Sequence, residues 1–152
     1  MAKGQPVTPE AGTDHPAAAP AELPEPRDRD GLRGLLTSFG AQLLREISDP
    51  AVVGMFRLAI AEAGNAPEVA RALTSIGGKA VDAALHKIMA GACQAGLLDG
   101  RSEELAERFW GLLWGGLQVK LLLGTSNRPV PGEMEARAEA AAEMFLRIHP
   151  KP

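Results

Sequence analysis

The sequence lacks several features that mark particular classes of protein. It has a single cysteine, Cys93, so no disulfide can form within the chain, and we expect a reducing compartment, the cytoplasm. No apolar stretch reaches the ~20 residues that cross a bilayer, and the N-terminus has no apolar segment typical of a signal peptide. We therefore expect a cytoplasmic chain without a membrane partner.

An excess of basic residues is also missing. Residues 1–30 hold three basic and six acidic residues, and the rest of the chain holds 13 of each. Proteins that bind DNA through its phosphates usually present a basic face, because neutralising phosphates and releasing counterions supplies much of the affinity. Direct contact of this polypeptide with nucleic acid is therefore not expected.

Motifs of catalysis and metal binding are absent as well. The sequence has no nucleophile elbow, no phosphate-binding loop and no paired carboxylate motif. Its three histidines, His15, His86 and His149, lie far apart, and no cluster has the spacing of metal ligands. We predict no enzyme, no cofactor and no metal site. An enzyme in a helical scaffold is the alternative, and it would need a polar pocket with a strongly perturbed acid or base.

The first thirty residues differ in composition from the rest. They contain six of the twelve prolines, no aromatic residue and hardly any large aliphatic side chain. Such a segment buries too little apolar surface to offset the entropy lost on ordering. We predict a disordered Pro/Ala-rich tail over residues 1–30 and one globular domain over residues 31–150.

Apolar residues recur at helical spacing from Gly31 onward, and no segment alternates as a strand does. The fold class is therefore predicted to be all-α, a helical bundle of about six helices. Asp49 before Pro50 is typical of an N-cap with proline at the first helical position, and Gly96 and Gly124 are typical helix ends. The predicted helices are residues 31–48, 50–64, 67–74, 77–95, 102–124 and 131–148.

The predicted helix 102–124 is apolar on two sides. At about 100° per residue its large side chains separate into two stripes. One stripe comprises Leu105, Phe109, Leu112, Gly116, Val119 and Leu123, and the other comprises Trp110, Trp114, Leu117 and Leu121. A single domain of this size has no obvious second layer of helices to cover both stripes.

A second copy of the chain would cover the remaining stripe. We predict that the last two helices pair with their symmetry mates as an intersubunit four-helix bundle, with small residues permitting close approach. The candidate interface residues are Gly111, Leu112, Gly115, Val119, Leu122, Met134, Ala138, Ala141 and Phe145. The sequence does not decide which stripe faces the partner. In the alternative, both stripes belong to the core of one chain.

The segment FRLAIAEAGNAPEVARAL, residues 56–73, resembles a segment near the start of the C-terminal regulatory domain of TetR-type transcriptional regulators, especially the AefR-like subgroup. The last two predicted helices also resemble those of that domain, and the resemblance covers about residues 32–148. It implies an all-helical domain that dimerises through its last two helices and encloses a ligand pocket between the others. In the family a separate N-terminal helix-turn-helix domain reads the operator.

The resemblance implies a small, hydrophobic effector as ligand. The candidate ligand-binding residues are Met55, Phe56, Met89, Cys93, Phe109, Trp110 and Trp114. Core packing is the alternative for each of them, and an interface is a further alternative for the tryptophans. Arg57 and Glu62 match the family's segment and are predicted to form an ion pair or to be solvated.

The tail of residues 1–30 has neither the length nor the periodicity of the helix-turn-helix domain. We therefore expect DNA to be bound through a domain that this chain does not contain. Two interpretations remain open. The chain is either the effector-binding and dimerisation part of a longer regulator, or an interaction protein without a helix-turn-helix domain that forms mixed dimers with a full-length regulator.

Overall fold

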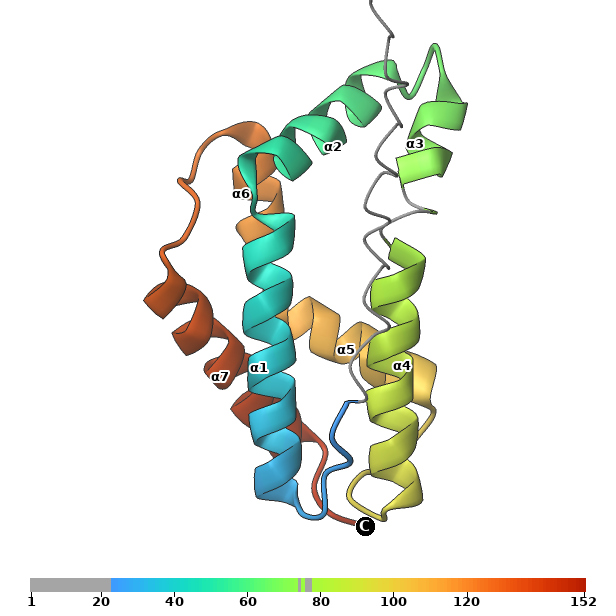
Figure 1. The fold of residues 1–152 in the computed structure, drawn as a ribbon, viewed down its shortest axis with the longest axis vertical. Helices are drawn as coiled ribbons and strands as arrows, with labels where there is room; N and C mark the ends of the chain where they lie inside the picture. Colours follow the sequence, from blue (N-terminus) through green and yellow to red (C-terminus); the bar gives the residue numbers. More distant parts are fainter. Residues whose placement is uncertain (1–22, 74, 76–77) are drawn as a thin grey trace, which may run out of the picture.

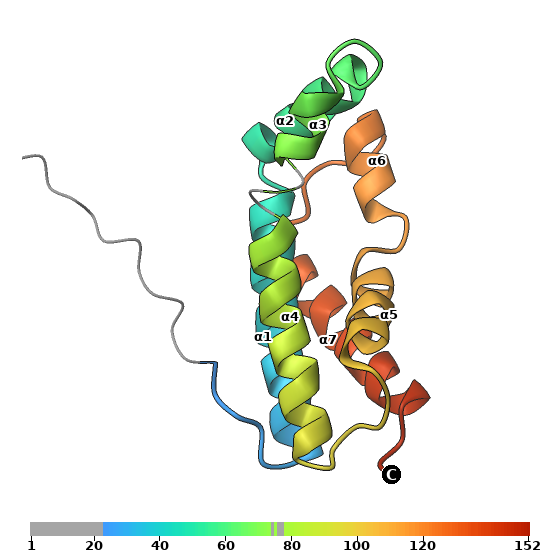
Figure 2. The same ribbon diagram turned by 90° about the vertical axis from the view of Figure 1, so that its right-hand side faces the viewer.

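The computed structural model describes residues 23–73, 75 and 78–152, and this part of the chain contains seven α-helices and no strand (Figure 1). The predicted all-α class is confirmed. The helices are α1 (Arg29–Ile47), α2 (Pro50–Glu62), α3 (Pro67–Leu73), α4 (Lys79–Gln94), α5 (Ser102–Trp114), α6 (Leu117–Leu123) and α7 (Pro131–Ile148). Figures 1 and 2 show α1 and α4 along the long axis of the molecule, with α2 and α3 across one end.

Aspartates begin the first two helices. The Asp28 carboxylate accepts a hydrogen bond from the Gly31 amide at 2.7 Å, and the Asp49 carboxylate accepts one from the Ala51 amide at 2.9 Å. These bonds satisfy amides that have no partner within the helix. The predicted start of α2 at Pro50 is confirmed.

The end of the predicted tail takes part in the fold. Residues 1–22 lie outside the described residues, but α1 already begins at Arg29, and Leu23 packs against the core. The Arg29 guanidinium donates hydrogen bonds to the main-chain oxygens of Leu97 at 2.9 Å and His149 at 2.7 Å. Leu23 and Arg29 thus contact the folded domain, although the prediction places them in the tail.

The prediction of one helix over residues 102–124 is wrong, because the chain bends at two glycines. Gly115 has φ +46° and ψ −130°, a conformation that a residue with a Cβ rarely adopts, and Gly116 follows it before α6 begins. In Figure 1 α5 and α6 run in different directions. The two stripes therefore do not extend along one rod: Trp114 is 2% exposed, whereas Leu123 on α6 is 72% exposed.

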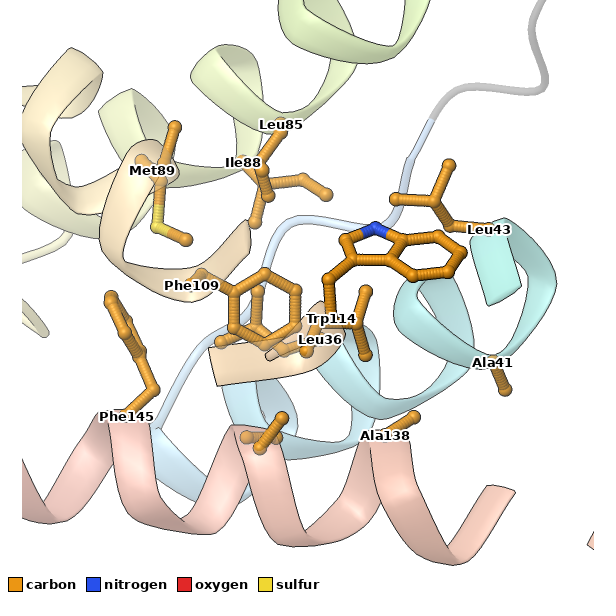
Figure 3. Packing of buried hydrophobic residues seen from close by; sticks show 14 of the residues in the cluster. Leu36, Ala41, Leu43, Leu85, Ile88, Met89, Phe109, Trp114, Ala138 and Phe145 are labelled. Atoms are coloured by element: carbon orange, nitrogen blue, oxygen red, sulfur yellow. The ribbon is translucent and has the colours of Figure 1, made fainter. Parts of the chain in front are cut away.

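The core lies where α1, α4, α5 and α7 meet (Figure 3). Phe109 and Phe145 are fully buried there, with ring centroids 5.7 Å apart and an interplanar angle of 82°, an edge-to-face arrangement. A Cβ added to Gly40 would lie 3.0 Å from Leu113 Cδ1 and 3.3 Å from Ala138 Cβ. Glycine on α1 therefore permits the close approach of both neighbouring helices.

Arginine side chains hold the C-terminal ends of several helices. Arg137 on α7 donates to the main-chain oxygens of Leu113 at 2.6 Å and Trp114 at 2.5 Å, at the end of α5. Arg57 on α2 donates to those of Leu121 at 2.7 Å and Leu122 at 2.9 Å, at the end of α6. The last carbonyls of a helix have no partner within it, so these guanidinium groups satisfy them and complement the negative end of the helix dipole.

Arg128 has the same role at the end of α1. Its guanidinium donates to the main-chain oxygen of Arg45 at 2.8 Å and lies 3.9 Å from the Asp49 carboxylate, just before α2. The corner between α1 and α2 is thus fixed by a residue more than 75 positions later in the chain. Arg57 is exposed, and the partners that the described structure gives for its guanidinium are main-chain carbonyls of α6.

Candidate functional site

A groove of about 590 Å³ lies between α1, α4 and the segment that precedes α1. Its apolar wall includes Leu35 from α1 and Ile88 from α4. Residues 23–26 form the opposite side. Helix α4 packs chiefly on α5 and α1 packs chiefly on α7, and the groove lies between α1 and α4.

The polar groups of the groove are few. Glu25, Lys87 and Gln94 are the residues with charged or amide side chains among those that line it. Pockets for small molecules are typically about 300–1,000 Å³, mostly apolar, with a few polar groups that orient the ligand. The size and the mixed lining of this groove suit a small, largely apolar molecule with one or two polar atoms.

The predicted ligand-binding residues do not line this groove. Two further grooves open on the described part of the chain, and none of the seven residues lines either of them. Met89, Phe109 and Trp114 are buried, Phe56, Cys93 and Trp110 are half-buried, and Met55 is 47% exposed. The sequence points to large aromatic and sulfur-containing side chains, whereas the groove is lined by aliphatic, polar and small residues of α1 and α4 and by the chain before α1.

Cys93 is held near the turn that follows α4. Its Sγ donates a weak hydrogen bond to the main-chain oxygen of Gly100 at 3.6 Å. Partial burial, and then the nearby Asp99 carboxylate, raise the pKa of this thiol. The neutral thiol is therefore favoured at neutral pH, and the setting is not the electropositive one that activates redox-sensing cysteines.

The two tryptophans lie together, Trp114 within the core and Trp110 packed against it. Their ring centroids are 5.9 Å apart, with an interplanar angle of 46°. The indole Nε1 of Trp114 is buried and has no hydrogen-bond partner among the described residues. In Figure 3 this nitrogen is on the ring edge turned toward Leu43 and Ile88, away from Phe145.

The predicted interface residues fall into two groups. Met134, Ala138, Ala141 and Phe145 are buried in the core of the single chain, where the small alanines let α7 approach α1. The remaining five lie on or near the surface: Gly111, Gly115 and Val119 are exposed, and Leu112 and Leu122 are half-buried. The small residues of α7 therefore serve close packing within the chain.

A different part of α7 is apolar and exposed. Ala140, Met144 and Ile148 follow one another at four-residue spacing, so they share one side of the helix. Met144 is 44% exposed and Ile148 is 54% exposed. This side is next to α5, because Arg137, three residues before Ala140, contacts the end of α5. We call the stripe of Ala140, Met144 and Ile148, together with Gly111 and Gly115, the outer face of α5 and α7.

Other kinds of site find no support in the described residues. They contain no group of three or more histidine, cysteine, aspartate or glutamate side chains placed to hold a metal ion. None of the helices in this part of the chain has the length and apolar character to cross a membrane.

Comparison with known proteins places the fold. The chain is similar to a solved structure of a TetR transcriptional regulator from Agrobacterium tumefaciens, with 25% identity, a TM-score of 0.74, and coverage of 84% of this chain and 62% of that one. It is also similar to a TetR-family transcriptional regulator from Mesorhizobium loti MAFF303099, with 25% identity, a TM-score of 0.70, and coverage of 77% and 58%. The chain thus spans about three fifths of the length of these relatives. No curated protein sequence gives a significant match.

A family model provides the assignment. The model described as AefR-like transcriptional repressor, C-terminal domain, matches residues 34–149, which include all of α2 to α7 and most of α1. The described helices and the structural relatives agree with that match. The chain belongs to the AefR-like C-terminal domain family of TetR-type transcriptional regulators.

Proposed function

We propose that this domain binds a small, predominantly apolar effector in the groove between α1 and α4, and that it pairs with a second copy through the outer face of α5 and α7. The observation that carries the effector proposal is the groove of about 590 Å³, in which aliphatic side chains such as Leu35 and Ile88 are joined by a few charged or amide groups. Binding of the effector to this domain would then change how an operator-binding domain elsewhere in the regulator is positioned.

The exposed stripe of α7 supports pairing. Met144 and Ile148 stand beside α5, on which Gly111 has no other atom within 4 Å of the position that a Cβ would take. A glycine in an exposed helix costs stability in a lone subunit, yet it lets a neighbouring backbone come close. Two copies of this face related by a two-fold axis would bury the stripe of each against the other.

The two proposals are linked by α5. This helix packs on α4, which forms one wall of the groove, and on α7, which carries the apolar stripe. An effector that binds one arrangement of α4 more tightly would favour the arrangement of the dimer that accompanies it. The free energy of coupling between the groove and the interface equals the difference in the effector's binding free energy between the two arrangements.

Sedimentation of the chain at micromolar concentration tests pairing. We expect a dimer for the natural sequence and a monomer for Met144→Glu, because the new carboxylate would be buried in the interface. Met55→Glu is the matched control, since Met55 is 47% exposed on α2, away from α5 and α7, and this variant should remain a dimer. A monomeric natural sequence, or a dimeric Met144→Glu variant, would contradict the proposal.

Binding of the neutral fluorescent probe N-phenyl-1-naphthylamine tests the groove. Gly91 lines the groove and has open space beside it, so Gly91→Leu fills the groove from one side. We expect this variant to bind the probe about tenfold more weakly than the natural sequence. Gly54→Leu, also with open space on an exposed helix face, is the control. If the two variants bind the probe with equal affinity, the probe binds outside the groove.

A further inference from the structure

The segment that precedes α1 borders open space in two directions. Residues 23–26 form one side of the groove between α1 and α4, and Figures 1 and 2 show this segment in blue beside the ends of both helices. Pro24, Glu25 and Pro26 also line a second groove, of about 460 Å³, that the segment forms with α1 alone. The segment is therefore not embedded in the helices on which it lies.

Few contacts hold this segment. In the part of the chain that the structure describes, no hydrogen bond or ion pair joins residues 23–27 to any other residue. Leu23 is half-buried against the core, and Pro26 lies over Gly31, where an added Cβ would be 3.8 Å from the Pro26 Cα. Segments with few buried contacts and no hydrogen bonds open at a low cost in free energy.

The end of the segment that joins α1 is fixed, in contrast. The Arg29 guanidinium donates hydrogen bonds to the main-chain oxygens of Leu97 and His149. Pro24 and Pro26 have restricted φ angles, and each keeps the residue before it extended. The segment should thus move as one stiff piece about its junction with α1.

Opposite charges face the groove from its two walls. Glu25 lies on the segment before α1, and Lys87 lies on α4. Neither side chain forms an ion pair with another residue of the described chain. A movement of the segment toward α4 would bring the carboxylate closer to the ammonium group, and their attraction would favour that movement.

We propose that residues 23–27 form a strap that closes over a bound effector, with Glu25 and Lys87 attracting each other across the groove. This inference rests on the proposed effector groove and deepens it by naming its regulation. The effector contacts α4 and the strap at the same time, so binding of the effector and closure of the strap favour each other. The strap is mobile in the free domain and fixed in the occupied one.

Exchange of the two charges tests the attraction. The affinity for N-phenyl-1-naphthylamine is measured for the natural chain, Glu25→Lys, Lys87→Glu and the variant with both changes. We expect about threefold weaker binding for each single variant, because like charges oppose closure, and recovery in the double variant. The probe is neutral, so a wall that does not move would give no such recovery.

Glu135→Lys is the control for charge reversal. Glu135 is exposed on α7 and is not among the residues that line this groove, so its variant should bind the probe as the natural chain does. A double variant that binds no better than the single variants would overturn the strap.

Nuclear magnetic resonance measures the mobility of the strap directly. The ¹H–¹⁵N heteronuclear NOE of the Glu25 and Arg27 amides should lie well below that of the α1 amides in the free chain, and should rise toward it when the probe binds. Amides that are rigid without the probe, or that stay mobile with it, would overturn the strap while the groove stands. If Gly91→Leu shows that the probe binds outside the groove, the groove and the strap are both overturned.

Discussion

Arg137 and Trp114 are joined by a hydrogen bond from the guanidinium Nη2 to the main-chain oxygen, 2.5 Å long. A second bond, from Nε to the oxygen of Leu113, makes the contact two-pronged. It ties α7 to the end of α5 at the point where the chain bends. One side chain thus closes a helix end and fixes the relative position of two helices.

Removing this contact should destabilise the domain. Arg137→Ala leaves the last carbonyls of α5 without their donor, and we expect the free energy of unfolding to fall by about 1–3 kcal/mol. The stability of Arg137→Lys should lie between that of the natural sequence and that of Arg137→Ala, because an ammonium group cannot reproduce the planar geometry of two parallel hydrogen bonds. Urea denaturation at one fixed protein concentration measures both.

Arg147→Ala is the control for Arg137→Ala. Arg147 lies on the same helix, but its recorded contact is an exposed ion pair with Glu143, at 3.1 Å. Its loss should change stability by no more than about 0.5 kcal/mol. Equal stabilities of the two alanine variants would show that the helix-end contact contributes little.

The bend at Gly115 should not tolerate a side chain. Gly115→Ala places a Cβ at φ +46° and 3.2 Å from the Arg137 guanidinium, and we expect a loss of about 1–2 kcal/mol in unfolding free energy. Gly54→Ala on α2 has open space and a helical backbone, so it should be neutral or stabilising by up to about 1 kcal/mol. Thermal unfolding of both variants makes the comparison, and a Gly115→Ala protein as stable as Gly54→Ala would contradict the bend.

The same residue change should have opposite effects at two positions of α1. Gly40→Ala would place a Cβ 3.0 Å from Leu113 and 3.3 Å from Ala138, both fully buried, so we expect overpacking and a loss of about 1–3 kcal/mol. Gly34→Ala meets no atom within 4 Å, and its better helix propensity should stabilise the chain by up to about 1 kcal/mol. Chemical denaturation distinguishes the two. Matching shifts of the same sign would mean that α1 does not pack on α5 and α7 as described.

His149 should make the domain sensitive to acid. Burial, and then the charges of Arg108 and Arg29, lower the pKa of His149 from its ordinary value of 6.5. The folded chain thus resists protonation while the unfolded chain accepts a proton, so this contribution to stability is present above the ordinary pKa and is lost as the pH falls.

We expect the melting temperature of the natural sequence to fall more steeply than that of His149→Asn between about pH 7.5 and pH 5. Thermal unfolding in a pH series checks this. The ring of His149 also packs against Phe145, at 4.8 Å between centroids, so the variant is compared by its slope with pH and not by its absolute stability. Identical slopes would show that His149 does not contribute.

The helices were largely predictable because their signals are local. Asp49 and Pro50 specify the start of α2 within two adjacent residues, and the last helix occupies 131–148 as predicted. The bend after Trp114 was missed because two glycines inside an apolar stretch are equally compatible with close helix packing. The φ value of Gly115 depends on what surrounds it, in particular on Arg137, 22 positions later.

The candidate site was less predictable, because it is formed by residues distant in the sequence. Residues 23–26 and Lys87 line the same groove although more than 60 positions separate them in the sequence. No local pattern near either segment indicates that they meet. Large apolar side chains were the best local guide to a ligand site, but Phe109 and Met89 are fully buried, whereas Leu35 of α1 and Ile88 of α4 are among the residues that line the groove.

The bend at Gly115 also decides how motion passes through the domain. A continuous helix could rotate or shift as one body, but the helical hydrogen bonds are interrupted at Gly115 and Gly116, between α5 and α6. A displacement of α2 and α6 would instead reach α7 through α1, which contacts both α2 and α7 over its 19 residues. Helix α1 would then carry such a displacement to α7, alongside the route from α4 through α5.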